Sequence, residues 1–317
     1  MDVVGIDMAV VERSARVLKH HAKNITGLDL YDERFYPPRN GDPEAVARYF
    51  IAMVAIDHRL SRPGKQYSAC LEDGCYKGAD LLYRLGMKIF MEDRDFFSPE
   101  RLSVITIDDV KKRLTVGEAS PPDPDVRAFL LRDLGLKLVK LYDGSVLKLI
   151  ERCGGKLRGS IENPGFIDCL KVFRAYEDPV EKKAMLLAKF LIRRGLLEVE
   201  DQLEVAVDNH LTRIALRLGL VMVSGSMWDK IKSSTEFTWE EDVILRMIVR
   251  RAYRYLSLKS GIPADVVDDF FWIMGRSICL RDEQPLCEKC LFKGFCKAKK
   301  NSAFMVREHV YYNTWYY

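Results

Sequence analysis

The chain has 317 residues, of which 48% are hydrophobic and 30% charged, and its formal net charge is +4. This composition suits one large or two small globular domains and excludes an intrinsically disordered chain. No apolar run reaches membrane-spanning length, and residues 1–20 lack the apolar core of a secretory signal, so we expect a cytoplasmic location.

Helical patterns occupy the start of the chain. Residues 7–23 are expected to form a first helix, and a second begins at Asp42 after a proline-containing loop. The second helix ends in a polar run, residues 57–64, which contains His58. That run is either a capped helix end or a loop that faces a ligand or a phosphate.

The helical pattern continues through the middle of the chain. Residues 70–77 are expected to form a glycine-containing loop, and residues 120–124 are the clearest turn or linker because three of the five are proline. Further helices are expected over residues 79–85, 125–138, 143–152 and 165–176. Because alternating strand patterns are nearly absent, the sequence predicts an almost wholly α-helical fold.

Two later segments place charged side chains at helix starts. One helix begins near Lys182 and Lys183 and stops at Gly195. Another, which is amphipathic, follows Asp208, whose side chain is expected to cap it. From these residues alone, the two lysines are interpreted as solvated first-turn residues and Asp208 as a helix cap.

The eight cysteines fall into two groups. The first group is scattered and is expected to be reduced, because no secretory signal is visible: Cys70, Cys75, Cys153 and Cys169. The second group has the spacing C-x7-C-x2-C-x5-C: Cys279, Cys287, Cys290 and Cys296. Thiolates this close in sequence can converge on one centre, and C-x2-C is too tight for a relaxed disulfide. The spacing therefore predicts metal ligation, by zinc or by a [4Fe–4S] cluster.

The C-terminal part of the chain resembles the endonuclease III family of helix-hairpin-helix DNA glycosylases. The likeness rests on a helix that ends in Gly275-Arg276 before the cysteine loop, and on Val207-Asp208-Asn209-His210 followed by Arg213 and Arg217. The family's cysteine spacing is C-x6-C-x2-C-x5-C, so this chain has one extra residue in the first gap. The archaeal 8-oxoguanine glycosylases have a similar lysine helix and Val-Asp motif without the cluster.

The resemblance implies a set of site residues. The four C-terminal cysteines would hold a [4Fe–4S] cluster, with zinc as the alternative. Asp208 would be the catalytic carboxylate, which stabilises the positive charge that develops on the sugar as an N-glycosidic bond breaks. Lys183, with Lys182 as a rival, would be the amine that forms a Schiff base and gives AP-lyase activity. Basic residues around the cluster loop are expected to contact nucleic-acid phosphates: Arg276, Arg281, Lys289 and Lys293.

The chain departs from the family in the hairpin before Lys183. The family's Leu-Pro-Gly-Val-Gly, whose backbone N–H groups hold a DNA phosphate, is replaced by Glu-Asp-Pro-Val-Glu at residues 177–181. Residues 125–191 are also similar to the queuosine-salvage N-glycosidases, which hydrolyse a small nucleotide and lack the cluster. The alternatives to a DNA glycosylase are a nucleotide N-glycosidase and a non-catalytic nucleic-acid-binding module.

The resemblance predicts an all-α, two-lobed helix-hairpin-helix glycosylase-like fold with a C-terminal four-cysteine cluster loop. One lobe is a helical bundle of residues 100–205, and the other joins residues 1–99 to residues 206–317. The expected activity is that of a base-excision DNA glycosylase in DNA repair. The expected partner is damaged duplex DNA or a modified nucleotide. No association with a membrane is expected, and the chain is expected to be monomeric.

Overall fold

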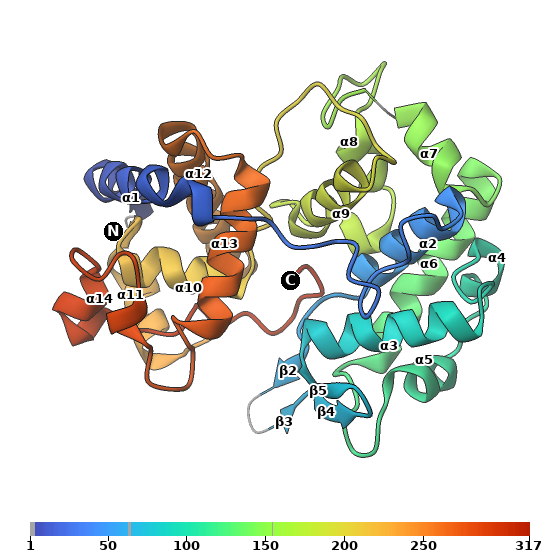
Figure 1. The fold of residues 1–317 in the computed structure, drawn as a ribbon, viewed down its shortest axis with the longest axis horizontal. Coiled ribbons are helices and arrows are strands. Elements are labelled where there is room, and N and C mark those ends of the chain that lie inside the picture. The colour runs from blue at the N-terminus through green and yellow to red at the C-terminus, as the bar shows by residue number, and fades with distance from the viewer. Residues whose placement is uncertain (1–3, 63–64, 154) are drawn as a thin grey trace. The chain divides into compact units, whose positions relative to one another are not determined.

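The computed structural model describes residues 4–62, 65–153 and 155–317 (Figure 1). The chain divides into two compact units. The first unit comprises Met1–Leu28 and Leu203–Thr314, and the second comprises Asp29–Gln202 and Trp315–Tyr317. None of the helices in the described ranges is long and apolar enough to cross a bilayer.

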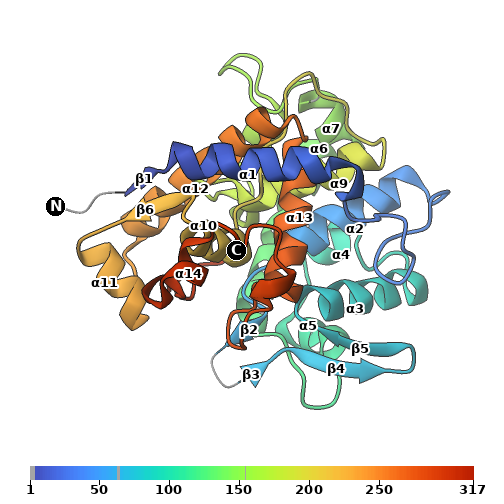
Figure 2. The same ribbon diagram turned by 60° about the vertical axis from the view of Figure 1, so that its left-hand side comes forward.

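The first unit is a group of helices with one small antiparallel strand pair. Its strands are β1 (Val4–Ile6) and β6 (Val221–Val223), with Val4 opposite Val223. Its α-helices are α1 (Met8–His21), α10 (Asn209–Leu218), α11 (Ser226–Ser233), α12 (Trp239–Ser260), α13 (Ala264–Ser277) and α14 (Lys297–Lys300). Short 3₁₀ turns lie at Ala22–Asn24, Cys287–Lys289 and Ser302–Phe304. Helix α1 lies along α12, and α10 packs against α13 (Figure 2).

Local sequence signals account for the helix ends in this unit. Thr238 and Glu241 form a reciprocal capping box at the start of α12, which satisfies two backbone N–H groups. Gly219 ends α10 with a φ of 92°, a left-handed conformation that glycine adopts without a steric penalty. The cysteine loop is joined to α13 by Phe292, whose ring stacks on that of Phe271 with 5.5 Å between centroids.

The second unit is a helical bundle with two short hairpins. Its α-helices are α2 (Pro43–Ala55), α3 (Ala79–Glu92), α4 (Pro99–Leu102), α5 (Ile107–Leu114), α6 (Pro124–Tyr142), α7 (Val146–Cys153), α8 (Phe166–Leu170) and α9 (Lys182–Arg193), and a 3₁₀ turn covers Arg174–Tyr176. The hairpins pair β2 (Ser61–Arg62) with β3 (Lys65–Gln66), and β4 (Ser68–Leu71) with β5 (Gly74–Lys77). Helix α2 is the centre of this unit, because every residue from Tyr49 to Ala55 is buried and the helix contacts α3, α6, α7 and α9.

Two expectations for this unit are corrected. Residues 70–77, expected as a loop, form the β4–β5 hairpin, in which Cys70 lies directly opposite Cys75 and is joined to it by a disulfide. Cys153, at the end of α7, forms a second disulfide with Cys169 on α8, with 6.4 Å between their Cα atoms. The expectation of four reduced thiols is therefore wrong, because the fold brings both pairs within disulfide reach.

The division into units differs from the expected one over the first hundred residues. Residues 29–99 belong with residues 100–202, because α2 packs on α7 and α9, and α3 packs on α5. The later boundary, after Gln202, lies close to the expected boundary at residue 205. The proline-containing turn at 120–124 is therefore a loop inside one unit.

Candidate functional site

Asp208 occupies the N-cap of α10 in an extended backbone conformation. Its Oδ1 accepts a hydrogen bond from the Leu211 backbone N–H at 3.0 Å, and its carbonyl oxygen accepts one from Thr212 Oγ1 at 2.8 Å. The preceding residues 205–207 are buried, and Ala206 N–H donates to Asp268 Oδ1 at 3.1 Å. The predicted cap is confirmed, and it holds the half-buried carboxylate in one orientation at the positive end of the helix dipole.

His210 lies two residues after Asp208 and is held as a neutral imidazole. Its Nδ1 is 2.9 Å from Arg213 Nη2, a group that only donates, so Nδ1 accepts and the proton lies on Nε2. Burial and the adjacent charge of Arg213 lower the pKa of His210 to about 3. Gly275 packs against His210 so closely that a Cβ at position 275 would lie 2.9 Å from the His210 Cβ.

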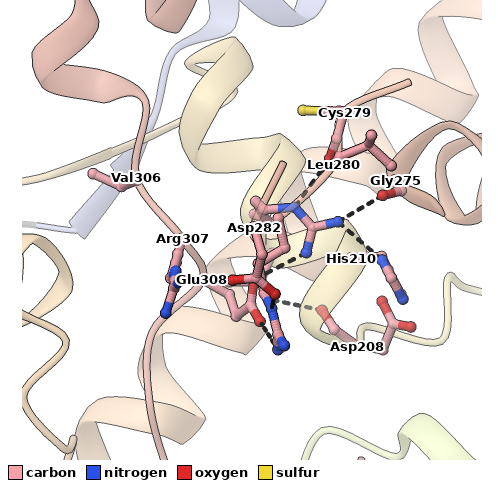
Figure 3. A network of polar contacts seen from close by, with 12 residues as sticks. Asp208, His210, Gly275, Cys279, Leu280, Asp282, Val306, Arg307 and Glu308 are labelled. Carbon is pink, nitrogen blue, oxygen red and sulfur yellow. Dashed lines mark hydrogen bonds and ion pairs between the residues drawn. The ribbon is translucent and has the colours of Figure 1, made fainter. Parts of the chain in front are cut away.

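Arg213 is buried and donates to residues that Figure 3 labels. Its Nε donates to the Cys279 carbonyl oxygen at 3.2 Å and its Nη2 to the Gly275 carbonyl oxygen at 2.7 Å. Its Nη1 donates to Glu308 Oε2 at 2.9 Å. This one guanidinium therefore joins α10 to the end of α13 and to residues near the C-terminus.

Arg217 lies one turn further along α10 and reaches the cysteine loop. Its Nη1 is 3.4 Å from Cys279 Sγ and donates to the Leu280 carbonyl oxygen at 2.6 Å. Its Nε donates to the Val306 carbonyl oxygen at 2.6 Å. Figure 3 labels Cys279, Leu280 and Val306, which come from two separate segments of the chain. The sequence carried a signal for this network in the four-residue spacing of the two arginines, which places them on one face of the helix.

The four C-terminal cysteines are free and partly buried, and all four line one small hollow together with Arg217. Burial is the largest of the effects that raise the pKa of Cys290 to about 11, and the charges of the other three cysteines act in the same direction. In number and in ligand type, four cysteine sulfurs on one short loop suit a thiolate-ligated metal group. The four sulfurs line the same hollow, but among the described residues no group of three or more His, Cys, Asp or Glu side chains is arranged as a complete metal site.

The predicted basic residues near this loop differ in their surroundings. Arg281 pairs with Asp282 at 2.8 Å and with Glu308 at 3.2 Å. Lys293 lies 3.5 Å from Glu288, whereas Lys289 is exposed.

Arg276, the fourth predicted basic residue, lies over the Trp272 ring at 4.2 Å. The lysines of α14 were not among the predicted basic residues; of these, Lys300 is exposed and Lys297 lies over the Phe304 ring at 3.9 Å. Their spacing, Lys-Ala-Lys-Lys directly after the last cysteine, was a readable signal of a basic surface.

Lys183 belongs to the second unit and is fully buried at the start of α9. Its Nζ donates to the Ala55 carbonyl oxygen and lies 3.3 Å from His58 Nδ1. Burial and the neighbouring charge of Lys182 lower the pKa of Lys183 well below its usual value. Lys182 is also buried, with its Nζ 3.7 Å from Asp57 Oδ2. The interpretation of both lysines as solvated residues is therefore wrong.

The hairpin before α9 already contains an anion. The Asp178 carboxylate accepts hydrogen bonds from the Val180 N–H at 2.9 Å and from the Lys182 N–H at 3.0 Å. Asp178 is buried, and Glu181 adopts a left-handed φ of 60° where the family has glycine. Backbone N–H groups that converge in such a turn suit an anion, and here a carboxylate of the same chain accepts two of them.

The sequence matches none of the protein-family models and none of the curated proteins with which it was compared. Solved structures do match the fold. A DNA-bound endonuclease III trapped as a covalent intermediate aligns with a TM-score of 0.51 and 15% identity, over 93% of this chain and 96% of that chain. A non-covalent endonuclease III–DNA complex aligns with a TM-score of 0.44 and 14% identity, over 93% of this chain and 97% of that chain. A thermostable thymine-DNA glycosylase aligns with a TM-score of 0.43 and 14% identity, over 92% of this chain and 98% of that chain.

The chain therefore has the fold of endonuclease III, the family that the sequence motifs resemble. The expectation of a mostly helical protein is confirmed, with the two hairpins of the second unit and the β1–β6 pair as its small strand content.

Proposed function

We propose that the chain is an N-glycosidase that removes a damaged base from duplex DNA, with Asp208 as its catalytic carboxylate. The observation that supports this most strongly is the fixed position of Asp208 at the N-cap of α10, next to the neutral His210. Breaking an N-glycosidic bond leaves positive charge on the sugar, and a carboxylate already held in place stabilises that charge without reorganisation. The shared fold supports the same activity.

The four cysteines are proposed to hold a [4Fe–4S] cluster, with zinc as the alternative. The cluster would supply structure: it would hold the loop that presents Lys289 and Lys293. Support comes from the hollow that the four thiols line and from the Arg217 guanidinium beside Cys279 Sγ, since hydrogen bonds to sulfur stabilise cluster ligands.

Lys183 is proposed as the nucleophile of an associated AP-lyase activity, with Lys182 as the rival. Its lone pair would attack C1′ while the bond from C1′ to the base breaks, and the base would leave with that electron pair and a proton. Loss of the Nζ proton and opening of the sugar ring would then give the Schiff base. The lowered pKa of Lys183 supports this role, because only the neutral amine is nucleophilic.

A second candidate function is the hydrolysis of a modified nucleotide. The Asp178 carboxylate favours this function, because it accepts hydrogen bonds from the Val180 and Lys182 N–H groups. Those N–H groups are then not available to a nucleic-acid phosphate. A small substrate does not need a backbone clamp of that kind. The third candidate is a nucleic-acid-binding module without catalytic activity.

Base release tests these candidates directly. The purified chain and its Asp208→Asn variant are incubated with a panel of duplexes that carry single damaged bases, and with free modified nucleotides. Base release from a duplex by the native chain, but not by Asp208→Asn, supports the DNA glycosylase. Release from free nucleotides alone supports the second function, and duplex binding without release of any base supports the binding module.

A further inference from the structure

His58 is a buried residue whose surroundings are not accounted for by stability alone. It lies three residues after the end of α2, the residue is 1% exposed, and its carbonyl oxygen accepts a hydrogen bond from the fully buried Arg127. Its Nδ1 lies 3.3 Å from Lys183 Nζ, and its Nε2 has no hydrogen-bond partner among the described residues. A buried polar atom without a partner costs about 1–3 kcal/mol, which makes it a candidate for a functional role.

The hydrogen bonds around Lys183 Nζ match a neutral amine. Two acceptors surround Nζ, the Ala55 carbonyl oxygen and His58 Nδ1. A neutral amine has two N–H groups, so both are used and the lone pair is left in the remaining direction. An ammonium would have a third N–H group, and the two acceptors here would already be used by the other two.

The charges around Lys183 favour the same form. Lys182 on α9 and Arg127 on α6 repel a proton on Nζ, whereas Asp57 and Asp178 attract one. Burial is the largest effect and disfavours the charged form. The imidazole of His58 meets the same surroundings, with Arg59 in addition, and its pKa is also lowered by burial and then by these cations.

We propose that His58 is a positioning residue for Lys183: Nδ1 accepts a hydrogen bond from Nζ and, together with the Ala55 carbonyl oxygen, aims the amine lone pair at an electrophilic carbon of the substrate. Nδ1 acts as the acceptor, so the His58 proton lies on Nε2. The inference rests on the proposed lysine chemistry. It adds a residue 125 positions away in sequence, in the polar run whose role the sequence left open.

A small aldehyde tests this without any nucleic acid. Amine and aldehyde give an imine and water, and borohydride then reduces the imine, so each modified lysine is identified by mass spectrometry. In the native chain, Lys183 should be modified at a pH where the exposed Lys140 of α6 is still protonated and unreactive. If Lys183 stays unmodified at every pH while Lys140 reacts, Lys183 is an inert helix cap and the inference is overturned.

Two variants separate positioning from the control of protonation. His58→Leu removes the acceptor, so the plateau rate of Lys183 modification should fall about 10-fold or more. The Nδ1 acceptor stabilises the ammonium form of Lys183. Its removal should therefore not raise the pH midpoint of Lys183 modification. His58→Asn supplies an oxygen near the Nδ1 position and should retain most of the rate. Equal rates in the native chain and in His58→Leu would refute the proposal.

The native chain provides a test that does not depend on whether the variants fold. The sequence has five histidines, so ¹⁵N-histidine NMR can resolve each imidazole. We expect His58 as the Nε2–H tautomer, with a pKa below the ordinary value for histidine. A His58 protonated on Nδ1, or one that titrates near pH 6.5, would contradict the geometry. Neither the aldehyde reaction nor the NMR measurement uses a nucleic-acid substrate. A chain that fails the base-release assay can therefore still pass or fail these two tests, so failure of the proposed function and failure of this inference are distinguishable.

Discussion

The guanidinium of Arg217 lies 3.4 Å from the sulfur of Cys279, which joins helix α10 to the cysteine loop. The same helix is capped by Asp208, and its other buried arginine, Arg213, binds the Cys279 carbonyl oxygen. Helix α10 therefore carries both the proposed catalytic carboxylate, at its N-cap, and two side chains that hydrogen-bond the cysteine loop. Changes at the cysteine loop are expected to reach α10 through these two arginines.

Metal analysis of anaerobically purified protein tests the cluster. We expect iron and inorganic sulfide in equal amounts. We also expect a broad absorption at about 400 nm, which is typical of iron–sulfur clusters bound by thiolates. Arg217→Met should lower the iron content after exposure to a chelator, because it removes the hydrogen bond to Cys279 Sγ. The exposed Arg251→Met on α12 is the control and should retain the metal. Zinc without iron or sulfide would reject the cluster.

Asp208→Asn should separate catalysis from folding. Asparagine also caps a helix, so the melting temperature should change little, whereas Asp208→Ala should cost about 1 kcal/mol through loss of the bond to the Leu211 N–H. The rate of base release should fall about 10²-fold or more in both variants, because both lack the carboxylate charge. Full activity in Asp208→Asn would refute the proposed catalytic role.

Lys183→Met should change how stability depends on pH. Because the pKa of Lys183 is lower in the folded chain than in the unfolded chain, unfolding takes up a proton at this site at any pH between the two values. The free energy of unfolding should therefore fall as the pH is lowered from about 10 towards the folded pKa, by up to about 1.4 kcal/mol per pH unit from this group. Denaturant titrations should show a flatter profile in Lys183→Met, and Lys140→Met serves as the exposed control. Parallel profiles in the native and Lys183→Met chains would show that Lys183 is charged when folded.

The disulfides predict a thiol count. Denatured, metal-free protein should expose four thiols without a reductant and all eight after reduction, because four cysteines are free and four are paired. The pair Cys153–Cys169 closes a loop of sequence separation 16, so its removal as a double serine variant should destabilise the chain by about 3 kcal/mol. Eight thiols without a reductant would contradict both bridges.

The salt dependence of duplex binding tests the basic surface. Lys289 and Lys300 are exposed, whereas Arg281 and Lys293 lie beside carboxylates. If both Lys289 and Lys300 contact phosphates, neutralising them should make the plot of log binding constant against log salt concentration less steep by about two units. Neutralising Arg281 and Lys293 should change the slope less. An unchanged slope in the first pair would place the phosphates elsewhere and favour the small-nucleotide substrate.

Features set by neighbouring residues could be predicted from the sequence. The cap at Asp208 and the capping box of Thr106 with Asp109 depend on contacts three residues apart, so their signals lie in short stretches of chain. The cysteine spacing likewise placed four thiols around one hollow, because one loop carries them all.

Features set by distant pairs needed the tertiary structure. Lys183 lies in a first helical turn whose sequence suits solvent, yet its Nζ meets the Ala55 carbonyl oxygen from a residue 128 positions earlier. Arg213 meets Glu308 across 95 residues, and no local pattern pairs them. Burial of these charges, and with it the lowered pKa of Lys183, depends on which helices pack together, and local spacing carries no information about that packing.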